Sequence, residues 1–291
     1  MFFLSRVPFR RVPVCCVRSF AAMAPRKRQR KSEYFASDSQ EESGNEDKKK
    51  KTKEIDSPKT SDETIPENFE REYKLIQEMR SKHDAPVDTQ GAECCPDPTA
   101  DPKVFRYQAL IGLMLSSQTK DEVTAAAMKR LRDYGLTPQH IMETNEEDLK
   151  KLIYPVGFYV RKSGYIKRTT AILLKDYDGD IPDTIEGLVK LPGVGPKMGY
   201  LTLQVAWKKM DGIGIDVHMH RICNRLHWVN TKTPEETRVA LESWLPKAYW
   251  REINPLIVGF GQQICGSKPK CKECKLKTIC PSSEEKDIED M

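Results

Sequence analysis

The segment LPGVGPK, residues 191–197, places a lysine directly after a glycine-containing turn, and Asp216 follows nineteen residues after Lys197. A neutral lysine amine is a nucleophile that can form a Schiff base. The positive end of a helix, or burial, would favour that neutral form. An aspartate within reach could stabilise developing positive charge and assist proton transfer. The pair therefore indicates nucleophilic chemistry, against the simpler interpretation of a solvated lysine and a helix-capping aspartate.

Residues 183–207 predict a helix, a tight turn and a second helix, with Asp183 or Thr184 as the first cap. Glycine permits backbone conformations that side chains block, and Pro196 suits the first turn of a helix, where its missing N–H is not needed. Main-chain N–H groups at such a turn suit a phosphate oxygen. We expect DNA contacts at Gly193, Val194 and Gly195; the alternative is a helical corner with packing glycines.

Four cysteines near the C-terminus follow the pattern C-x5-C-x2-C-x5-C: Cys265, Cys271, Cys274 and Cys280. Four thiols in so short a segment are typical of a metal site, for which zinc is the default. A 4Fe–4S cluster also takes four cysteines, so both remain open at this point. Lys268 and Lys270, between the first two cysteines, could contact phosphate or form a solvated rim.

Composition sets wider limits. The 291 residues carry a net charge of +5, which is compatible with a polyanionic partner but does not prove one. No apolar stretch is long enough to predict a membrane span. Residues 1–64 are rich in Ser, Asp, Glu and Lys and cannot bury enough apolar surface to fold alone, and residues 284–291 form an acidic tail.

From about residue 65 onward the apolar spacing is helical and nothing alternates like a strand, so the predicted fold class is all-α. Asp121 is expected to cap one helix, and Thr144 another with Glu147 as its capping-box partner. A loop is expected from residue 81 through Pro102. The expected helices cover residues 69–80, 105–118, 121–134, 144–154, 161–174, 183–190, 196–208, 217–228, 234–245 and 250–263.

Two of these helices share a short repeated sequence. Lys162-Ser-Gly-Tyr165 is repeated as Lys197-Met-Gly-Tyr200, thirty-five residues later. A repeated helix–turn–helix unit would explain the similarity, although two copies do not make a repeat array.

The hairpin, Lys197, the segment IGIDVHMHRI around Asp216 and the four cysteines occur together in an order that resembles the helix–hairpin–helix DNA glycosylases with a Gly/Pro-Asp signature. Within that group the chain is similar to the endonuclease III family, including its eukaryotic thymine glycol glycosylases, over roughly residues 66–283. One departure is that the family usually has six residues between its first two cysteines, where this chain has five.

The resemblance implies a bifunctional DNA glycosylase and AP lyase that excises oxidised pyrimidines from duplex DNA in base excision repair. It implies Lys197 as nucleophile, Asp216 as its catalytic partner and Gln118, in LSSQTKD, as the residue that fills the space left by a flipped base. It also implies a 4Fe–4S cluster on the four cysteines, with zinc as the alternative. His218 and His220 do not share a helix face, so we interpret both as structural or DNA-facing and not as metal ligands, and we count His218 among the DNA-binding residues.

The resemblance further implies a two-domain architecture. A helical barrel domain would cover residues 99–209, including the hairpin at 183–207, and a discontinuous iron–sulfur helical domain would cover residues 65–98 and 210–283. We expect a monomer whose partner is double-stranded DNA with damaged or abasic sites.

Three other functions remain open. A monofunctional mismatch glycosylase resembles this architecture but lacks a lysine at the position of Lys197. A non-catalytic DNA-binding module with a zinc knuckle would release no base. An RNA-binding protein would fit the basic tail, but it would leave the lysine–aspartate pair unexplained.

Residues 1–22 contain Arg6, Arg10, Arg11 and Arg18 and no acid, which resembles a mitochondrial transit peptide, although a simple basic tail is the alternative. The basic cluster PRKRQRK, residues 25–31, is typical of nuclear import or nucleic-acid binding and follows Met23, a possible second start. We therefore expect both mitochondrial and nuclear localisation, where disulfides do not persist. With a C-terminal tag, replacing Met23 should remove the nuclear product; an unchanged distribution would contradict two starts.

Overall fold

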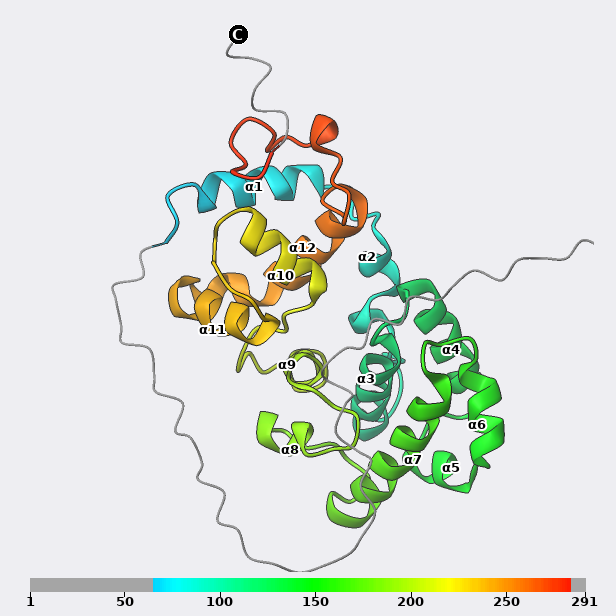
Figure 1. The fold of residues 1–291 in the computed structure, drawn as a ribbon. Helices are drawn as coiled ribbons and strands as arrows, with labels where there is room; N and C mark the ends of the chain where they lie inside the picture. Colours follow the sequence, from blue (N-terminus) through cyan, green and yellow to red (C-terminus); the bar gives the residue numbers. More distant parts are fainter. Residues whose placement is uncertain (1–64, 284–291) are drawn as a thin grey trace, which may run out of the picture. The chain divides into compact units, whose positions relative to one another are not determined.

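The computed structural model describes residues 65–283, and this part of the chain is helical without strands, as the sequence predicts (Figure 1). The predicted tail over residues 1–64, with its transit peptide and basic cluster, and the acidic tail over residues 284–291 lie outside the described residues. No described helix has the length and apolar character that crossing a membrane requires.

The longer helices follow one another through short connections. They are α1 (Phe69–Met79), α2 (Pro86–Gln90), α3 (Pro102–Ser116), α4 (Asp121–Tyr134), α5 (Pro138–Glu143), α6 (Glu146–Ile153), α7 (Tyr159–Asp176), α8 (Ile185–Val189), α9 (Pro196–Thr202), α10 (Val217–Arg225), α11 (Pro234–Trp244) and α12 (Trp250–Gln263). Helix α9 continues as a short π-helix over Leu203–Trp207, and 3-10 turns lie at Ala92–Cys94, Lys247–Tyr249 and Cys271–Glu273.

The expected loop before Pro102 is wrong in part, because it contains α2 and the 3-10 turn at Ala92–Cys94. Helix α3 also begins three residues earlier than expected. Asp101 accepts a hydrogen bond from the amide of Lys103 and so caps a helix whose first residue is Pro102. A short polar cap and a proline at the first position start the helix there.

Two expected caps are wrong. Asp121 is the first residue of α4 rather than its cap, and its carboxylate accepts a hydrogen bond from Gln262 instead. Asn145 caps α6 by accepting from the amide of Glu147, while the hydroxyl of Thr144 donates to the carbonyl of His140 at the end of α5. A distant residue therefore binds the expected cap of α4, which has no side-chain cap, whereas at α6 the neighbouring Asn145 takes the role through a local hydrogen bond.

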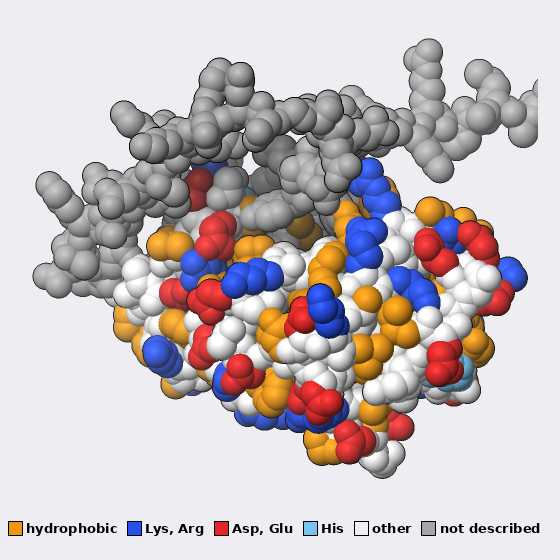
Figure 2. All heavy atoms as spheres, turned by 90° about the horizontal axis from the view of Figure 1, so that it is seen from below, with side chains coloured by type: hydrophobic (Ala, Val, Ile, Leu, Met, Phe, Trp, Pro, Cys, Tyr) orange, Lys and Arg blue, Asp and Glu red, His pale blue; other side chains and the backbone are white. Residues whose placement is uncertain are grey.

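The buried apolar side chains form two clusters. The first draws its residues from position 95 to position 207, with Tyr107, Leu110, Leu131, Ile166 and Leu203 among those without exposed surface. The second draws its residues from α1 and from position 210 onward, including Phe69, Ile222, Ile253 and Ile257. The predicted boundaries of two domains stay a prediction. The face drawn in Figure 2 carries basic and acidic side chains interspersed with apolar ones.

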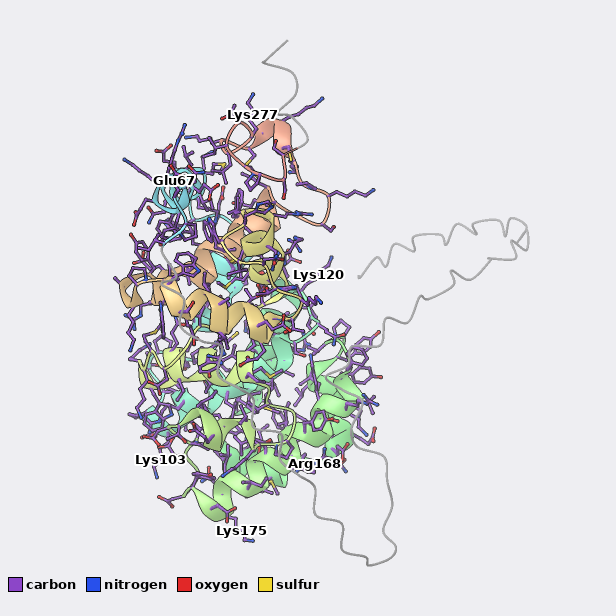
Figure 3. The ribbon with its side chains drawn as sticks, turned by 60° about the vertical axis from the view of Figure 1, so that its left-hand side comes forward. Glu67, Lys103, Lys120, Arg168, Lys175 and Lys277 are labelled. Atoms are coloured by element: carbon purple, nitrogen blue, oxygen red, sulfur yellow. The ribbon has the colours of Figure 1, made fainter. Side chains whose placement is uncertain are left out.

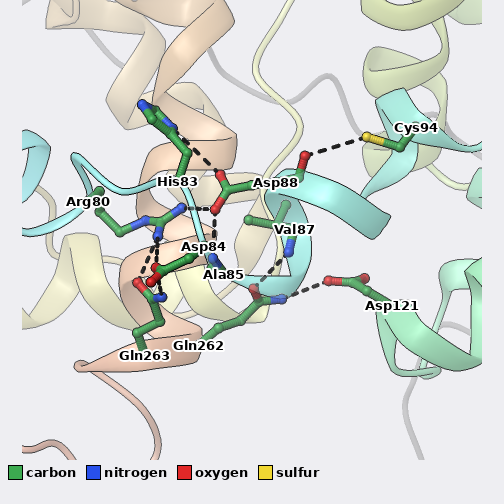
Figure 4. A network of polar contacts seen from close by, with 10 residues as sticks. All are labelled: Arg80, His83, Asp84, Ala85, Val87, Asp88, Cys94, Asp121, Gln262 and Gln263. Carbon is green, nitrogen blue, oxygen red and sulfur yellow. Dashed lines mark hydrogen bonds and ion pairs between the residues drawn. The ribbon is translucent and has the colours of Figure 1, made fainter.

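A polar network links α1, α2 and α12 and reaches α4 (Figure 4). The guanidinium of Arg80, only 2% exposed, donates to Asp88 at 2.5 Å and to Gln263 at 2.7 Å. It lies against Gly259, where a Cβ would approach its Nη2 atom to 2.4 Å. The neighbouring Gln262 accepts from the amide of Val87 and donates to Asp121 at 2.7 Å. Partly buried hydrogen bonds therefore join α12, a helix of the second cluster, to α2 and to α4, a helix of the first.

The Asp88→Ala variant tests this network. Removing the carboxylate leaves a buried guanidinium with only the exposed Asp84, at 4.0 Å, as a charged partner, so the free energy of unfolding should fall by about 3 kcal/mol. Urea denaturation measures the change. The matched variant Asp133→Ala removes the exposed partner of Lys129 and should change it by less than about 1 kcal/mol. Equal effects of the two variants would show that the network adds no stability.

Candidate functional site

The predicted hairpin lies between α8 and α9. Thr184, and not Asp183, caps α8 by accepting from the amide of Gly187. Gly193 has a φ of +79°, and a Cβ there would lie 2.8 Å from the ring of Tyr165, so both conformation and space require glycine. Gly195 differs from expectation. Its φ is −100° and nothing lies within 4 Å of a Cβ, so its missing side chain leaves open space beside the turn.

The hairpin presents unused main-chain donors. Val194 is 7% exposed and its amide donates to the carbonyl of Leu191. The amides of Gly193 and Gly195, in contrast, donate to no acceptor in the described part of the chain. Pro196 is the first residue of α9, as predicted. The turn therefore offers two N–H groups to an external acceptor such as a phosphate oxygen.

Lys197 is the second residue of α9 and is exposed. Its amine makes no hydrogen bond or ion pair with any residue between 65 and 283. Asp216 is 8% exposed and caps α10, because its Oδ1 atom accepts from the amide of Met219 at 2.7 Å. Its Oδ2 atom accepts no hydrogen bond from the described residues. The capping role of Asp216 is confirmed, and it leaves one carboxylate oxygen available.

Lys197 and Asp216 both influence the pKa of His218. Burial lowers its pKa, the nearby Asp216 carboxylate raises it, and Arg221 and Lys197 lower it further. Lys197 and Asp216 therefore both lie close enough to His218 to influence its charge. The Nδ1 atom of His218 lies 3.0 Å from Arg221, and a Cβ on Gly261 would approach it to 2.5 Å. These contacts show how the imidazole is packed, while its predicted contact with DNA stays a prediction.

His220 has separate partners, since its Nδ1 atom lies 2.7 Å from the hydroxyl of Thr237. Gln118 is exposed in the loop between α3 and α4, with a φ of +51°. The main residue that the site prediction missed is Lys162 on α7, which is 5% exposed and donates to the main chain of the Gln118 loop. The only feature of the sequence that pointed to Lys162 was the similarity of its segment to the segment that contains Lys197.

Three of the four cysteines, Cys265, Cys274 and Cys280, pack against the second apolar cluster, and α10 holds the loop that begins with Cys265. Arg221 donates to the carbonyl of Cys265 at 2.9 Å. Arg225 donates to the Sγ atom of Cys265 at 3.4 Å and to the carbonyls of Gly266 and Ser267. Lys268 and Lys270 are exposed on this loop. The arginines thus fix the loop by its main chain and leave both lysines free to face solvent.

The thiols are close enough to influence one another. Burial, with smaller contributions from the other three cysteines, raises the pKa of Cys274 to about 11. Burial also raises the pKa of Cys280, with contributions from Cys265 and Cys271. Within residues 65–283 no three Cys, His, Asp or Glu side chains are arranged closely enough to hold a metal ion. The donor set of four neighbouring thiols fits an iron–sulfur cluster chemically, provided that ligand binding removes their protons and draws the side chains together.

The family relationship comes from three comparisons. The model of the HhH-GPD superfamily of base excision DNA repair proteins matches residues 111–247. Endonuclease III-like protein 1 of Gallus gallus is 57% identical over 222 residues, which cover 75% of this chain and 79% of that protein.

Two solved structures share the fold over 75% of this chain. A trapped covalent intermediate of endonuclease III with DNA matches with a TM-score of 0.65 at 24% identity over 97% of its chain. A non-covalent endonuclease III–DNA complex matches with a TM-score of 0.64 at 25% identity over 96% of its chain. A helical hairpin with free amides, an exposed lysine beside it and a buried aspartate thus occur in a chain that belongs to the endonuclease III-like protein 1 family of base excision DNA repair proteins.

Proposed function

We propose that Lys197 and Asp216 perform the catalysis of this chain, a bifunctional DNA glycosylase and AP lyase that removes oxidised pyrimidines in base excision repair. The observation that carries the assignment is the contrast between the two side chains. Lys197 is exposed and has no partner between residues 65 and 283, while Asp216 is buried and keeps one carboxylate oxygen free of hydrogen bonds from these residues. A nucleophile must be free to meet the sugar, and a charge-stabilising group must be held still.

The chemistry follows in order. The damaged base leaves the stack so that its sugar can be reached. The neutral amine of Lys197 attacks C1′ of the deoxyribose, and the base departs with the electrons of the glycosidic bond. Asp216 stabilises the positive charge that develops on the sugar and helps to move the proton from the amine. The sugar ring then opens: the C1′–O4′ bond breaks, O4′ takes up a proton, and the nitrogen forms a protonated imine with C1′. This imine acidifies the C2′ proton, and loss of that proton expels the 3′ phosphate by β-elimination.

The proposed partner is duplex DNA that carries a damaged or abasic site, as in the related endonuclease III complex. The unused amides of Gly193 and Gly195 would donate hydrogen bonds to a phosphate of the strand, and the open space at Gly195 allows the main chain to approach it closely. We assign Gln118, exposed at its loop, to the gap left by the flipped base. His218 would face the same DNA, and Lys268 and Lys270 would contact phosphates at the cysteine loop. No observation requires a second copy, so we propose a monomer.

For the cofactor we propose a 4Fe–4S cluster held by Cys265, Cys271, Cys274 and Cys280, with zinc as the alternative. Its support is the neighbourhood of the four thiols and the hydrogen bond from Arg225 to Cys265. The cluster would tie the C-terminal segment to α10. We also propose that the two apolar clusters belong to a barrel domain and an iron–sulfur domain, and that the protein works in nucleus and mitochondrion.

The Lys197→Ala variant tests the nucleophile. Borohydride reduces the imine between enzyme and sugar, so the native protein should become covalently attached to an oligonucleotide duplex with a thymine glycol or a preformed abasic site. The variant should form no such adduct, and mass spectrometry of the native adduct should place the crosslink at residue 197. A crosslink at another side chain, or an adduct formed by the variant, would contradict the assignment.

The Asp216→Asn variant serves as the comparison in the same assay. Asparagine can still cap α10, so DNA binding should change little while base release slows on the order of 10²-fold because the charge is lost. A loss confined to affinity would assign Asp216 a structural role only. Base release without strand cleavage by the native protein would favour a monofunctional glycosylase, and no release at all would favour a DNA-binding module.

The cofactor assignment predicts about four irons per chain and a visible absorption band in the purified protein. Cys274→Ala should lose most of the iron and the band, because it removes one of four ligands. The control Cys94→Ala changes an exposed cysteine outside the group and should retain both. A colourless protein that contains one zinc would decide for the alternative metal.

A further inference from the structure

Lys162 is a buried cation without a carboxylate partner. Its Nζ atom donates to the carbonyl of Leu115 at 2.7 Å, to that of Ser117 at 2.6 Å and to the hydroxyl of Thr119 at 3.1 Å. No ion pair joins it to an acid within the described residues. Burial lowers its pKa to about 8. An ammonium in such a place is unfavourable unless oxygen atoms surround it, and its three acceptors lie in the last turn of α3 and in the loop that follows it.

That loop carries Gln118. The residues that Lys162 contacts lie on both sides of Gln118, whose φ of +51° is uncommon for a residue with a side chain. From the other side, the amide of Gly157 donates to the hydroxyl of Thr119 at 3.1 Å, and a Cβ on Gly157 would lie 2.6 Å from the carbonyl of Gln118. The main chain around Gln118 is therefore clamped, while its side chain is exposed.

The same helix also holds the hairpin. The hydroxyl of Thr169 donates to the carbonyl of Pro192 at 3.1 Å. The ring of Tyr165 lies against Gly193, at the distance that excludes a Cβ there. The exposed guanidinium of Arg168 lies over the same ring, with its Cζ atom 5.0 Å from the ring centroid. Figure 3 marks Arg168 on α7 and Lys120 at the end of the Gln118 loop.

The three contacts come from one face of α7, because Lys162, Tyr165 and Thr169 have the spacing i, i+3, i+7. Seven residues of α-helix span about 10 Å. From this geometry we propose that α7 is a positioning element that fixes the Gln118 loop relative to the hairpin, with Lys162 as the positioning residue for Gln118. The inference rests on the proposed function. In it, one protein helix, α7, holds both Gln118, which enters the DNA duplex, and the hairpin, which binds the DNA backbone.

The chain supplies a matched control. Lys167, also on α7, donates to three main-chain carbonyls, those of Ile141, Met142 and Thr144, at the end of α5. Lys162→Met and Lys167→Met therefore remove the same kind of contact from the same helix, but only the first releases the Gln118 loop. A general loss of stability would affect both variants.

The experiment compares base release from a thymine glycol duplex with borohydride trapping on a duplex with a preformed abasic site. A displaced Gln118 should impair opening of the stack, so Lys162→Met should lower kcat for base release by about tenfold or more, since small misplacements cost up to 10²-fold. Trapping at the abasic site, which has no base to extrude, should fall by less than about threefold. Lys167→Met should leave both within about twofold of the native protein.

A double-mutant cycle separates positioning from general damage. If Lys162 acts through Gln118, adding Lys162→Met to Gln118→Ala should change base release by less than about twofold. Thr169→Val, at the other end of the face, should raise the Kd for damaged and undamaged duplexes alike, because it frees the hairpin that grips the phosphates.

Three results would overturn the inference: normal base release by Lys162→Met, equal losses from Lys162→Met and Lys167→Met, or an undiminished effect of Lys162→Met in the Gln118→Ala background. These outcomes differ from a failure of the proposed function, in which the native protein itself forms no adduct at Lys197.

Discussion

The close contact between the ring of Tyr165 and the main chain of Gly193 is the constraint on which the site depends. A side chain at Gly193 would meet the ring at 2.8 Å, so the hairpin can lie against α7 only with glycine there. This contact and the hydrogen bond from Thr169 to Pro192 hold the turn before it meets any partner. Because the hairpin leads directly into α9, the same contacts also set where Lys197 stands.

Helix α10 has a comparable role on the other side of the site. It begins at Asp216, which is buried and hydrogen-bonded as its cap, and its arginines hold the loop that starts at Cys265. Both helices contact loops mainly through hydrogen bonds to main-chain carbonyls. Such contacts fix the path of a loop without depending on its side chains, so the exposed residues Gln118, Lys268 and Lys270 are free to face a partner.

Two apolar clusters carry these helices, and polar groups join them. Arg80 is almost fully buried against Gly259 and bonded to Asp88 and Gln263, while Gln262 reaches Asp121 at the start of α4. Directional hydrogen bonds specify one arrangement of the contacting elements, whereas apolar contact alone tolerates sliding. Lys197 at the N-terminus of α9 and Asp216 at the N-terminus of α10 can act together only when the arrangement of these helices is fixed.

The sequence by itself determined the all-helical fold class, because apolar residues repeat at helical spacing over short ranges, and it determined the hairpin and the cap at Asp216, because these depend on adjacent residues. It also supplied the candidate pair Lys197 and Asp216 and the four cysteines. Tertiary structure alone decided that Asp121 pairs with Gln262 instead of capping α4, that Gly193 but not Gly195 lacks room for a side chain, and that Lys162 clamps the loop of Gln118. Those outcomes depend on residues that are distant in the chain, and a local pattern carries no information about the atoms that will lie opposite it.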